Sequence, residues 1–163
     1  MTIYHPIKPF YNENSKILIL GSFPSVKSRE QMFFYGHPQN RFWRVISNAY
    51  NSEPPKSIEE KKIFLDKNNI AIWDLIASCE IEGSSDSSIK NATPNDLSLI
   101  FNNCNIEKIF VNGRTAEKYF NLYLKEKYNR EAICLPSTSP ANAKWSLEEL
   151  ISEWKKVLDL KEN

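Results

Sequence analysis

The protein has 163 residues, with 21 Lys or Arg against 20 Asp or Glu, so its net charge is +1 at pH 7. This length suits one hydrophobic core, and a 41% share of hydrophobic residues excludes a wholly disordered chain. The near-zero net charge argues against a protein that holds nucleic acid by bulk positive charge, but it leaves room for a local basic face.

Four short apolar runs have the composition of buried strands. They cover residues 16–21, 69–73, 108–111 and 132–135. Continuous apolar runs of this length are typical of strands that are buried on both faces, as in a parallel sheet. We therefore expect one domain over residues 1–163, built around a mostly parallel sheet of four strands.

Helical patterns lie between and after these runs, and several begin with a polar residue of the kind that caps a helix. The expected helices are residues 40–50, one capped by Ser57 with Glu60, one opened by Thr93, Pro94 and Asp96, residues 115–128, and one capped by Ser146 with Glu149. Strands that alternate with helices in this way predict a three-layer α/β/α fold.

The chain has no signature of a membrane protein, a secreted protein or a metal site. No apolar run approaches the ~20 residues that a membrane span needs, and residues 1–16 lack the pattern of a signal peptide. The cysteines and histidines are scattered without a metal-binding spacing; they are Cys79, Cys104, Cys134, His5 and His37. We expect a cytoplasmic protein with no metal and no organic cofactor.

Unusual residues follow each predicted strand. These segments are residues 21–25 (GSFPS), 73–78 (WDLIAS), 112–114 (NGR) and 136–140 (PSTSP). Because ligands of open parallel sheets bind beyond the carboxyl ends of the strands, we expect the functional site to be made by these segments.

Three segments together resemble the uracil-DNA glycosylase superfamily, and its hypoxanthine-DNA (deoxyinosine) glycosylase branch in particular. They are GSFPS with FFYGHPQNRFWRVI (residues 21–25 and 33–46), NGRTA (112–116) and LPSTSPAN (135–142). The resemblance spans residues 15–155. It implies the fold of that superfamily and a base-excision repair enzyme that flips a deaminated base, favouring hypoxanthine, out of DNA and hydrolyses its N-glycosidic bond. The implied partner is DNA containing deaminated bases, and we expect a monomer.

The resemblance implies catalytic roles for two asparagines. Other branches carry a water-positioning Asn or Asp where this chain has Phe23, so the role passes to Asn40, whose amide can hold a water or read a base edge. The structural alternative for Asn40 is a helix N-cap. Asn112 is expected to recognise the base or support the water, and its alternative is a turn residue before Gly113.

Four residues are candidates for the base pocket. Gly21 lets the backbone turn tightly and approach a ligand, and Phe23 lies in the same turn. Tyr35 is a candidate for stacking on the base, with a core aromatic cluster as the alternative interpretation. His37 could stabilise the leaving base, although bracing its own loop is the alternative.

The serine-rich loop resembles the DNA clamp of the superfamily, because small hydroxyls suit phosphate contacts and prolines fix the shape of a loop. The expected DNA-binding residues are Ser22, Ser25, Ser137, Thr138, Ser139, Pro140, Ala141, Asn142 and Lys144. Residues 140–142 are the expected wedge that fills the space left by the flipped base, and Lys144 adds a cation.

No Lys lies inside the motifs to form a Schiff base, so we expect monofunctional cleavage that leaves an abasic site. The alternatives are a mismatch-specific uracil-DNA glycosylase and a catalytically silent member that binds DNA or a nucleotide. A dinucleotide-binding enzyme is disfavoured, because GSFPSV lacks the GxGxxG pattern. The net charges of residues 1–47 (+4) and 90–145 (+3) predict a basic face around the crevice.

Overall fold

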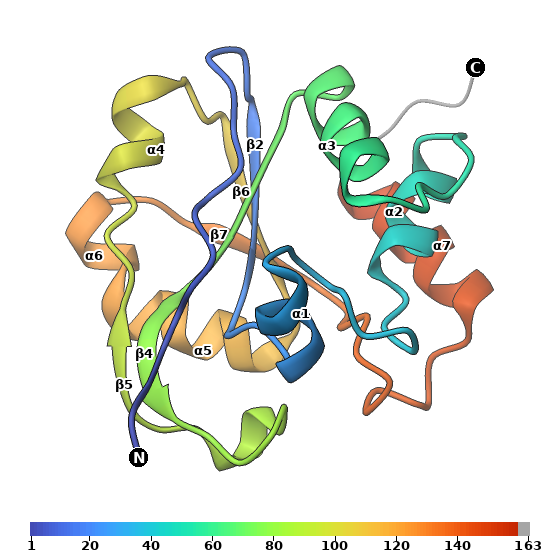
Figure 1. Cartoon of the computed structure of the whole chain (residues 1–163). Coiled ribbons are helices and arrows are strands. Elements are labelled where there is room, and N and C mark those ends of the chain that lie inside the picture. Colours follow the sequence, from blue (N-terminus) through green and yellow to red (C-terminus); the bar gives the residue numbers. More distant parts are fainter. Residues whose placement is uncertain (160–163) are drawn as a thin grey trace.

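The computed structural model describes residues 1–159, and a parallel sheet of four strands forms its centre (Figure 1). The strands are β2 (Ile17–Gly21), β3 (Ile70–Asp74), β6 (Lys108–Asn112) and β7 (Ala132–Leu135). Their order in the sheet is β3-β2-β6-β7, and all three pairs are parallel. The four-stranded parallel sheet expected from the apolar runs is confirmed.

The side chains of β2 alternate between two separate cores, one on each face of the sheet. Ile19 packs into the first core, whereas Leu18 and Leu20 pack into the second. The helices over the first face are α2 (Phe42–Ala49), α3 (Ile58–Lys67) and α7 (Leu147–Val157), and those over the second are α4 (Ser98–Asn103), α5 (Arg114–Tyr123) and α6 (Lys125–Tyr128). This arrangement confirms the three-layer α/β/α fold (Figure 1).

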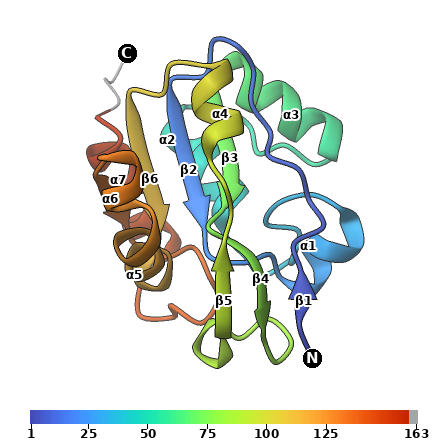
Figure 2. The same cartoon turned by 90° about the vertical axis from the view of Figure 1, so that its left-hand side faces the viewer.

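A second, antiparallel sheet was not predicted from the sequence. It consists of β1 (Ile3–Tyr4), β4 (Ile76–Glu80) and β5 (Lys90–Pro94) in the order β1-β4-β5 (Figure 2). The predicted helix start at Thr93 and Pro94 is therefore wrong, because both residues lie in β5 and Thr93 pairs with Ser78. The helix begins later, at Ser98, whose backbone N–H donates to Asp96 at 2.9 Å.

Two other helices begin at their predicted caps, whereas the helix expected over 40–50 begins at Phe42. Ser57 accepts the backbone N–H of Glu60 at the start of α3, and Ser146 forms the complete capping box with Glu149 at the start of α7. The helix expected over 115–128 is present as α5 and α6, which meet at Leu124. Within residues 1–159, the helices all lack the combined length and apolar character that crossing a membrane requires.

Candidate active site

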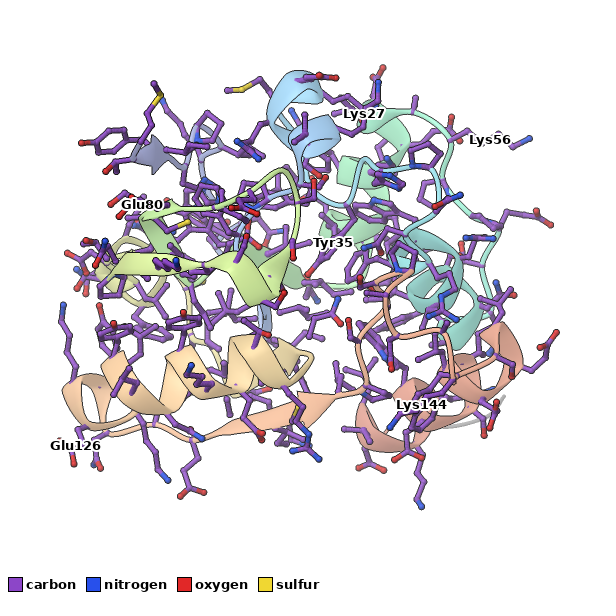
Figure 3. The ribbon with its side chains drawn as sticks, turned by 90° about the horizontal axis from the view of Figure 1, so that it is seen from below. Lys27, Tyr35, Lys56, Glu80, Glu126 and Lys144 are labelled. Carbon is purple, nitrogen blue, oxygen red and sulfur yellow. The ribbon has the colours of Figure 1, made fainter. Side chains whose placement is uncertain are left out.

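The carboxyl ends of the parallel strands meet at one edge of the sheet, which Figure 3 shows from below. Gly21 ends β2 and is paired with Asp74, which ends β3. Asn112 ends β6 and is paired with Leu135 at the end of β7. Tyr35 lies near the middle of this view. The segments that follow the strands therefore converge on this edge, as expected.

A chain of hydrogen bonds joins Asn40, Thr138 and Asn112, and we call these three residues the amide network. The Asn112 Nδ2 atom donates to the Thr138 hydroxyl at 3.0 Å, and this hydroxyl donates to the Asn40 Oδ1 atom at 2.9 Å. The backbone N–H of Thr138 donates to the Asn112 Oδ1 atom at 3.1 Å. All three sequence motifs therefore contribute one residue each to a single set of contacts.

The Asn40 oxygen is fully engaged in this structure. Besides the Thr138 hydroxyl, Asn40 Oδ1 accepts the backbone N–H of Phe42 at 2.9 Å, at the start of α2. The Asn40 side chain thus accepts the N–H of the first residue of α2, but the N-cap position is taken by Arg41, so Asn40 is not the N-cap that was offered as its structural alternative. Its Nδ2 atom makes no hydrogen bond to residues 1–159, and it is not among the buried polar atoms that lack a partner there. Asn40 therefore has two N–H donors available for a ligand.

Tyr35 is held in an unusual conformation beside the network. Its φ of 53° is in the left-handed region, which a bulky side chain rarely adopts. One face of its ring stacks on Phe42, with centroids 4.0 Å apart. Burial of the hydroxyl, and then the negative charge of Asp74, raise the pKa of Tyr35, and the nearby Asn112 side chain opposes this shift. Tyr35 is therefore a neutral phenol with one ring face already covered.

Gly21 is required by the close approach of two side chains. A Cβ atom at this position would lie 2.5 Å from Asp74 Oδ1 and 2.9 Å from the Tyr35 hydroxyl. Asp74 cannot simply move away, because its Oδ2 atom accepts a hydrogen bond of 2.8 Å from His5 Nε2. The backbone N–H of Ile7 donates to His5 Nδ1, so the ring hydrogen of the neutral imidazole is on Nε2. No sequence motif indicates this contact, since His5 and Asp74 are 69 residues apart.

The serines of the first motif make contacts within the protein. The Ser22 hydroxyl donates to both carboxylate oxygens of Asp86 at 2.9 Å. Asp86 is an exposed residue, but burial of its carboxyl group raises the pKa of Asp86; the Ser22 hydrogen bond opposes this shift and the charge of Asp74 adds to it. Ser25 caps α1 (Val26–Gln31) by accepting the Ser28 N–H. Both serine hydroxyls therefore donate within the protein in this structure.

Phe23 and His37 both have structural contacts. Phe23 is 7% exposed and packs in the second core. Its ring is nearly perpendicular to that of His5, with centroids 5.9 Å apart, and Arg29 lies over its face. His37 accepts the backbone N–H of Gln39 with its Nδ1 atom. The loop-bracing interpretation of His37 is confirmed by that bond, and its Nε2 atom is left for other contacts.

Two serine hydroxyls stabilise the loop of residues 136–146, which we call the clamp loop, by bonding to its own backbone. The Ser137 hydroxyl accepts the Ser139 N–H, and the Ser139 hydroxyl accepts the Ala141 N–H, each at 3.1 Å. Each hydroxyl still has its hydrogen, which is suited to donate to a phosphate oxygen. Pro140 and Ala141 are exposed, and Lys144 is exposed beside α7 in Figure 3.

Arg41 holds the clamp loop against the start of α2. Its guanidinium donates to the carbonyl oxygens of Ser139 and Asn142 at 3.1 Å and to that of Trp145. Its backbone N–H donates to the Thr138 carbonyl oxygen at 3.1 Å. Sequence reasoning missed this role, although the residue lies inside the HPQNRFW motif that supported the resemblance.

Other features of the surface do not join this site. Two cavities of about 230 and 310 Å³ are lined by residues around α3 and by residues near 6–10, and no member of the amide network lines either one. In the described part of the chain, no three His, Cys, Asp or Glu side chains gather in a way that suits a metal ion.

Comparisons with known proteins agree with the motifs. The family model described as the uracil DNA glycosylase superfamily matches residues 8–160. A hypoxanthine DNA glycosylase of Methanosarcina acetivorans is 38% identical, and one of Methanosarcina barkeri is 31% identical, each over 90% of this chain and 92% of the relative. The solution NMR structure of a candidate uracil DNA glycosylase from Methanosarcina acetivorans has a TM-score of 0.78 at 32% identity, covering 97% of this chain and 99% of that one.

Proposed function

Because the chain belongs to the uracil DNA glycosylase superfamily, we propose that it is a monofunctional DNA glycosylase that removes hypoxanthine from DNA containing deoxyinosine. Two relatives named for hypoxanthine support this choice of base. The enzyme flips the deaminated nucleotide into the crevice at the carboxyl edge and hydrolyses its N-glycosidic bond. The product is an abasic site.

The observation that carries the proposal is the amide network. It brings donors from three distant segments to the edge where a parallel sheet binds its ligands. Hydrolysis of an N-glycosidic bond needs hydrogen-bond donors that stabilise the charge on the departing base, and amides are suited to this at neutral pH. Asn40 and Asn112 are the proposed catalytic residues.

The remaining residues provide contacts to the base and to the DNA backbone. Tyr35 stacks on the flipped base with the ring face that Phe42 leaves uncovered. Gly21 lets the Asp74 carboxylate and the Tyr35 hydroxyl lie against the backbone at the base pocket, because a Cβ atom there would contact both. The clamp loop binds phosphates through the hydroxyls of Ser137 and Ser139. Lys144 adds a positive charge at its end.

The absence of an active lysine from the motifs supports cleavage without a Schiff base. We also propose that the enzyme needs no metal or organic cofactor and acts as a monomer in the cytoplasm. Strand breakage should therefore require alkali after the reaction, and should be unaffected by EDTA. Size-exclusion chromatography with and without DNA tests the monomer.

The test is a cleavage assay with labelled oligonucleotides that contain hypoxanthine, xanthine or uracil opposite each normal base. We expect alkali-dependent strand breaks at hypoxanthine, and a loss of about 100-fold or more in the single-turnover rate of Asn40→Ala and Asn112→Ala. Intact oligonucleotides with the wild-type protein would refute the activity. Cleavage at uracil alone would refute the choice of base.

A further inference from the structure

We propose that the hydroxyl of Thr138 positions the amide of Asn40 so that its NH2 group, and not its oxygen, faces the flipped base. The inference rests on the proposed function and concerns the same site. Thr138 acts through Asn40, so it is a positioning residue. In this arrangement Asn40 is a hydrogen-bond donor to the departing base.

The orientation of both amides is set by backbone donors. The N–H of Phe42 can only donate, so the atom of Asn40 that it contacts at 2.9 Å must be the oxygen. By the same reasoning the N–H of Thr138 identifies Asn112 Oδ1 as its acceptor. Asn112 Nδ2 then donates to the Thr138 hydroxyl. The single hydrogen of that hydroxyl is left for Asn40 Oδ1 at 2.9 Å.

Burial stabilises this orientation of the Asn40 amide against rotation. Thr138 is 0% exposed, so its hydroxyl has no bulk water as a substitute partner. If the Asn40 amide rotated by 180°, its NH2 group would face the Phe42 N–H, and both this N–H and the hydrogen of the Thr138 hydroxyl would lose their acceptor. Enclosed donors without acceptors are costly, and the observed orientation is therefore strongly favoured.

The oriented amide is useful at the moment when the bond breaks. The electron pair of the bond between the sugar C1′ atom and the base leaves with the base, while the oxygen of a water molecule forms the new bond to C1′. That water releases the proton that the base finally takes up. Donors held in advance near the base stabilise the negative charge that it gains before this proton arrives. Asn40 provides two such donors, since its oxygen is occupied.

The same orientation distinguishes a deaminated base from its amino parent, such as hypoxanthine from adenine. Deamination replaces an exocyclic amino group, which donates hydrogen bonds, by a carbonyl oxygen, which accepts them. An amide that presents only N–H groups pairs with the carbonyl and leaves an amino group unpaired. Sites that depend on such a hydrogen bond reject the analogue that lacks the matching group far more strongly than apolar pockets do.

The experiment compares Thr138→Val with Thr138→Ser. Valine has the shape of threonine without the hydroxyl, whereas serine retains the hydroxyl. With enzyme in excess over hypoxanthine DNA, we expect Thr138→Val to lose about 10- to 100-fold in cleavage rate. The serine variant should recover most of that loss. The Kd for an oligonucleotide with 2′-fluoro-deoxyinosine, which resists hydrolysis, should change less than the rate. Equal rates for the valine and serine variants would overturn the proposal.

A second variant keeps the test decisive if Thr138→Val fails to fold. Asn40→Asp preserves the two hydrogen bonds that the oxygen accepts and replaces the NH2 donors by a negatively charged oxygen, which can only accept. We expect it to fold, to keep the hydrogen bond from the Phe42 N–H, and to lose about 100-fold or more in rate. Wild-type activity in Asn40→Asp would overturn the donor role. Adding Thr138→Val to Asn40→Asp should lower the cleavage rate little further, because both changes remove the contribution of the oriented NH2 group.

A readout without catalysis separates this proposal from the proposed function. The side-chain NH2 group of Asn40, assigned by its loss in Asn40→Asp, gives a pair of signals in a proton–nitrogen NMR spectrum. These signals should move or broaden in Thr138→Val and stay close to their positions in Thr138→Ser. Unchanged signals in the valine variant would refute the positioning role, even if the protein cleaved no DNA. Shifted signals in a protein that cleaves no DNA would refute only the proposed function.

Discussion

Replacement of Arg41 by Gln should release the clamp loop and weaken DNA binding. The guanidinium donates to three backbone carbonyls of the loop, those of Ser139, Asn142 and Trp145. Glutamine is shorter and has a single NH2 group, so it cannot span these acceptors. Arg41→Lys retains the charge, but its compact ammonium cannot replace the planar fork and should behave almost as poorly.

The expected loss follows from the contacts. A hydrogen bond from a charged donor contributes about 1.5–3 kcal/mol net. The clamp loop is partly exposed, so water can hydrate the carbonyls once they are released, and we expect a total loss of about 2–4 kcal/mol in the free energy of unfolding. Thr138 still contacts Asn112, and Trp154 Nε1 still donates to the Pro136 carbonyl. The start of the loop should therefore stay in place while residues 139–145 become mobile.

Three measurements check this prediction. Urea unfolding gives the stability loss, and limited proteolysis reports cleavage inside residues 139–145. Fluorescence anisotropy with 2′-fluoro-deoxyinosine DNA should show a Kd raised about 10-fold, because binding must now order the loop. The rate with saturating enzyme should fall less than the affinity.

Arg44→Gln is the matched control, since it removes the same charge from an exposed position one turn further along α2. It should weaken DNA binding only through the lost charge and leave the loop resistant to protease. If Arg41→Gln and Arg44→Gln had equal stability and equal affinity, the loop would not depend on the guanidinium contacts, and the reasoning would be wrong.

Two further predictions concern other parts of the site. Gly21→Ala should lose activity and about 1–3 kcal/mol of stability, because the added methyl group contacts the fixed carboxylate of Asp74; Gly83→Ala, which meets no atom within 4 Å but has a φ of +58°, should lose about 1–2 kcal/mol and keep its activity. Wild-type cleavage by Gly21→Ala would contradict this. The raised pKa of Asp86 means that the folded protein holds the carboxyl proton more tightly than the unfolded chain does. The stability that this proton contributes is fully present below the usual aspartate pKa, and it is lost as the pH rises through the folded-state pKa. Urea unfolding of Asp86→Asn between pH 4 and pH 7 should show its stability rising relative to wild type as the pH increases, and a constant or falling difference would be inconsistent with the shift.

The central sheet was predictable because each of its strands is an apolar run with its own turn signals. The second sheet was not, because β5 reads KNATP, in which only Ala92 and Pro94 are apolar. Its polar side chains suit the exposed face of an antiparallel pair, and Thr93 followed by Pro94 has the composition of a helix start. Pairing with β4 outweighed that local preference.

The location of the site was predictable from the rule that ligands bind beyond the carboxyl ends of parallel strands. The contacts inside it were not, because they join residues far apart in the chain. Thr138 and Asn40 are 98 residues apart, and Arg41 is 104 residues from Trp145. Thr138 could be named only as part of a serine-rich loop, and Arg41 only as part of a motif. Three-dimensional packing decides which hydroxyl and which arginine join the two segments.

The pairing of β2 also determines when the chain can fold during its synthesis. Ile17, at its start, is paired with Ile70 on one side and with Lys108 on the other, so most contacts of this strand are of high contact order. A chain that leaves the ribosome from its N-terminus cannot complete the sheet until β6 and β7 have emerged. Asn40 acquires its Thr138 partner later still. A nascent or truncated chain therefore carries the motif residues without the oriented amide, and activity should appear only at the end of folding.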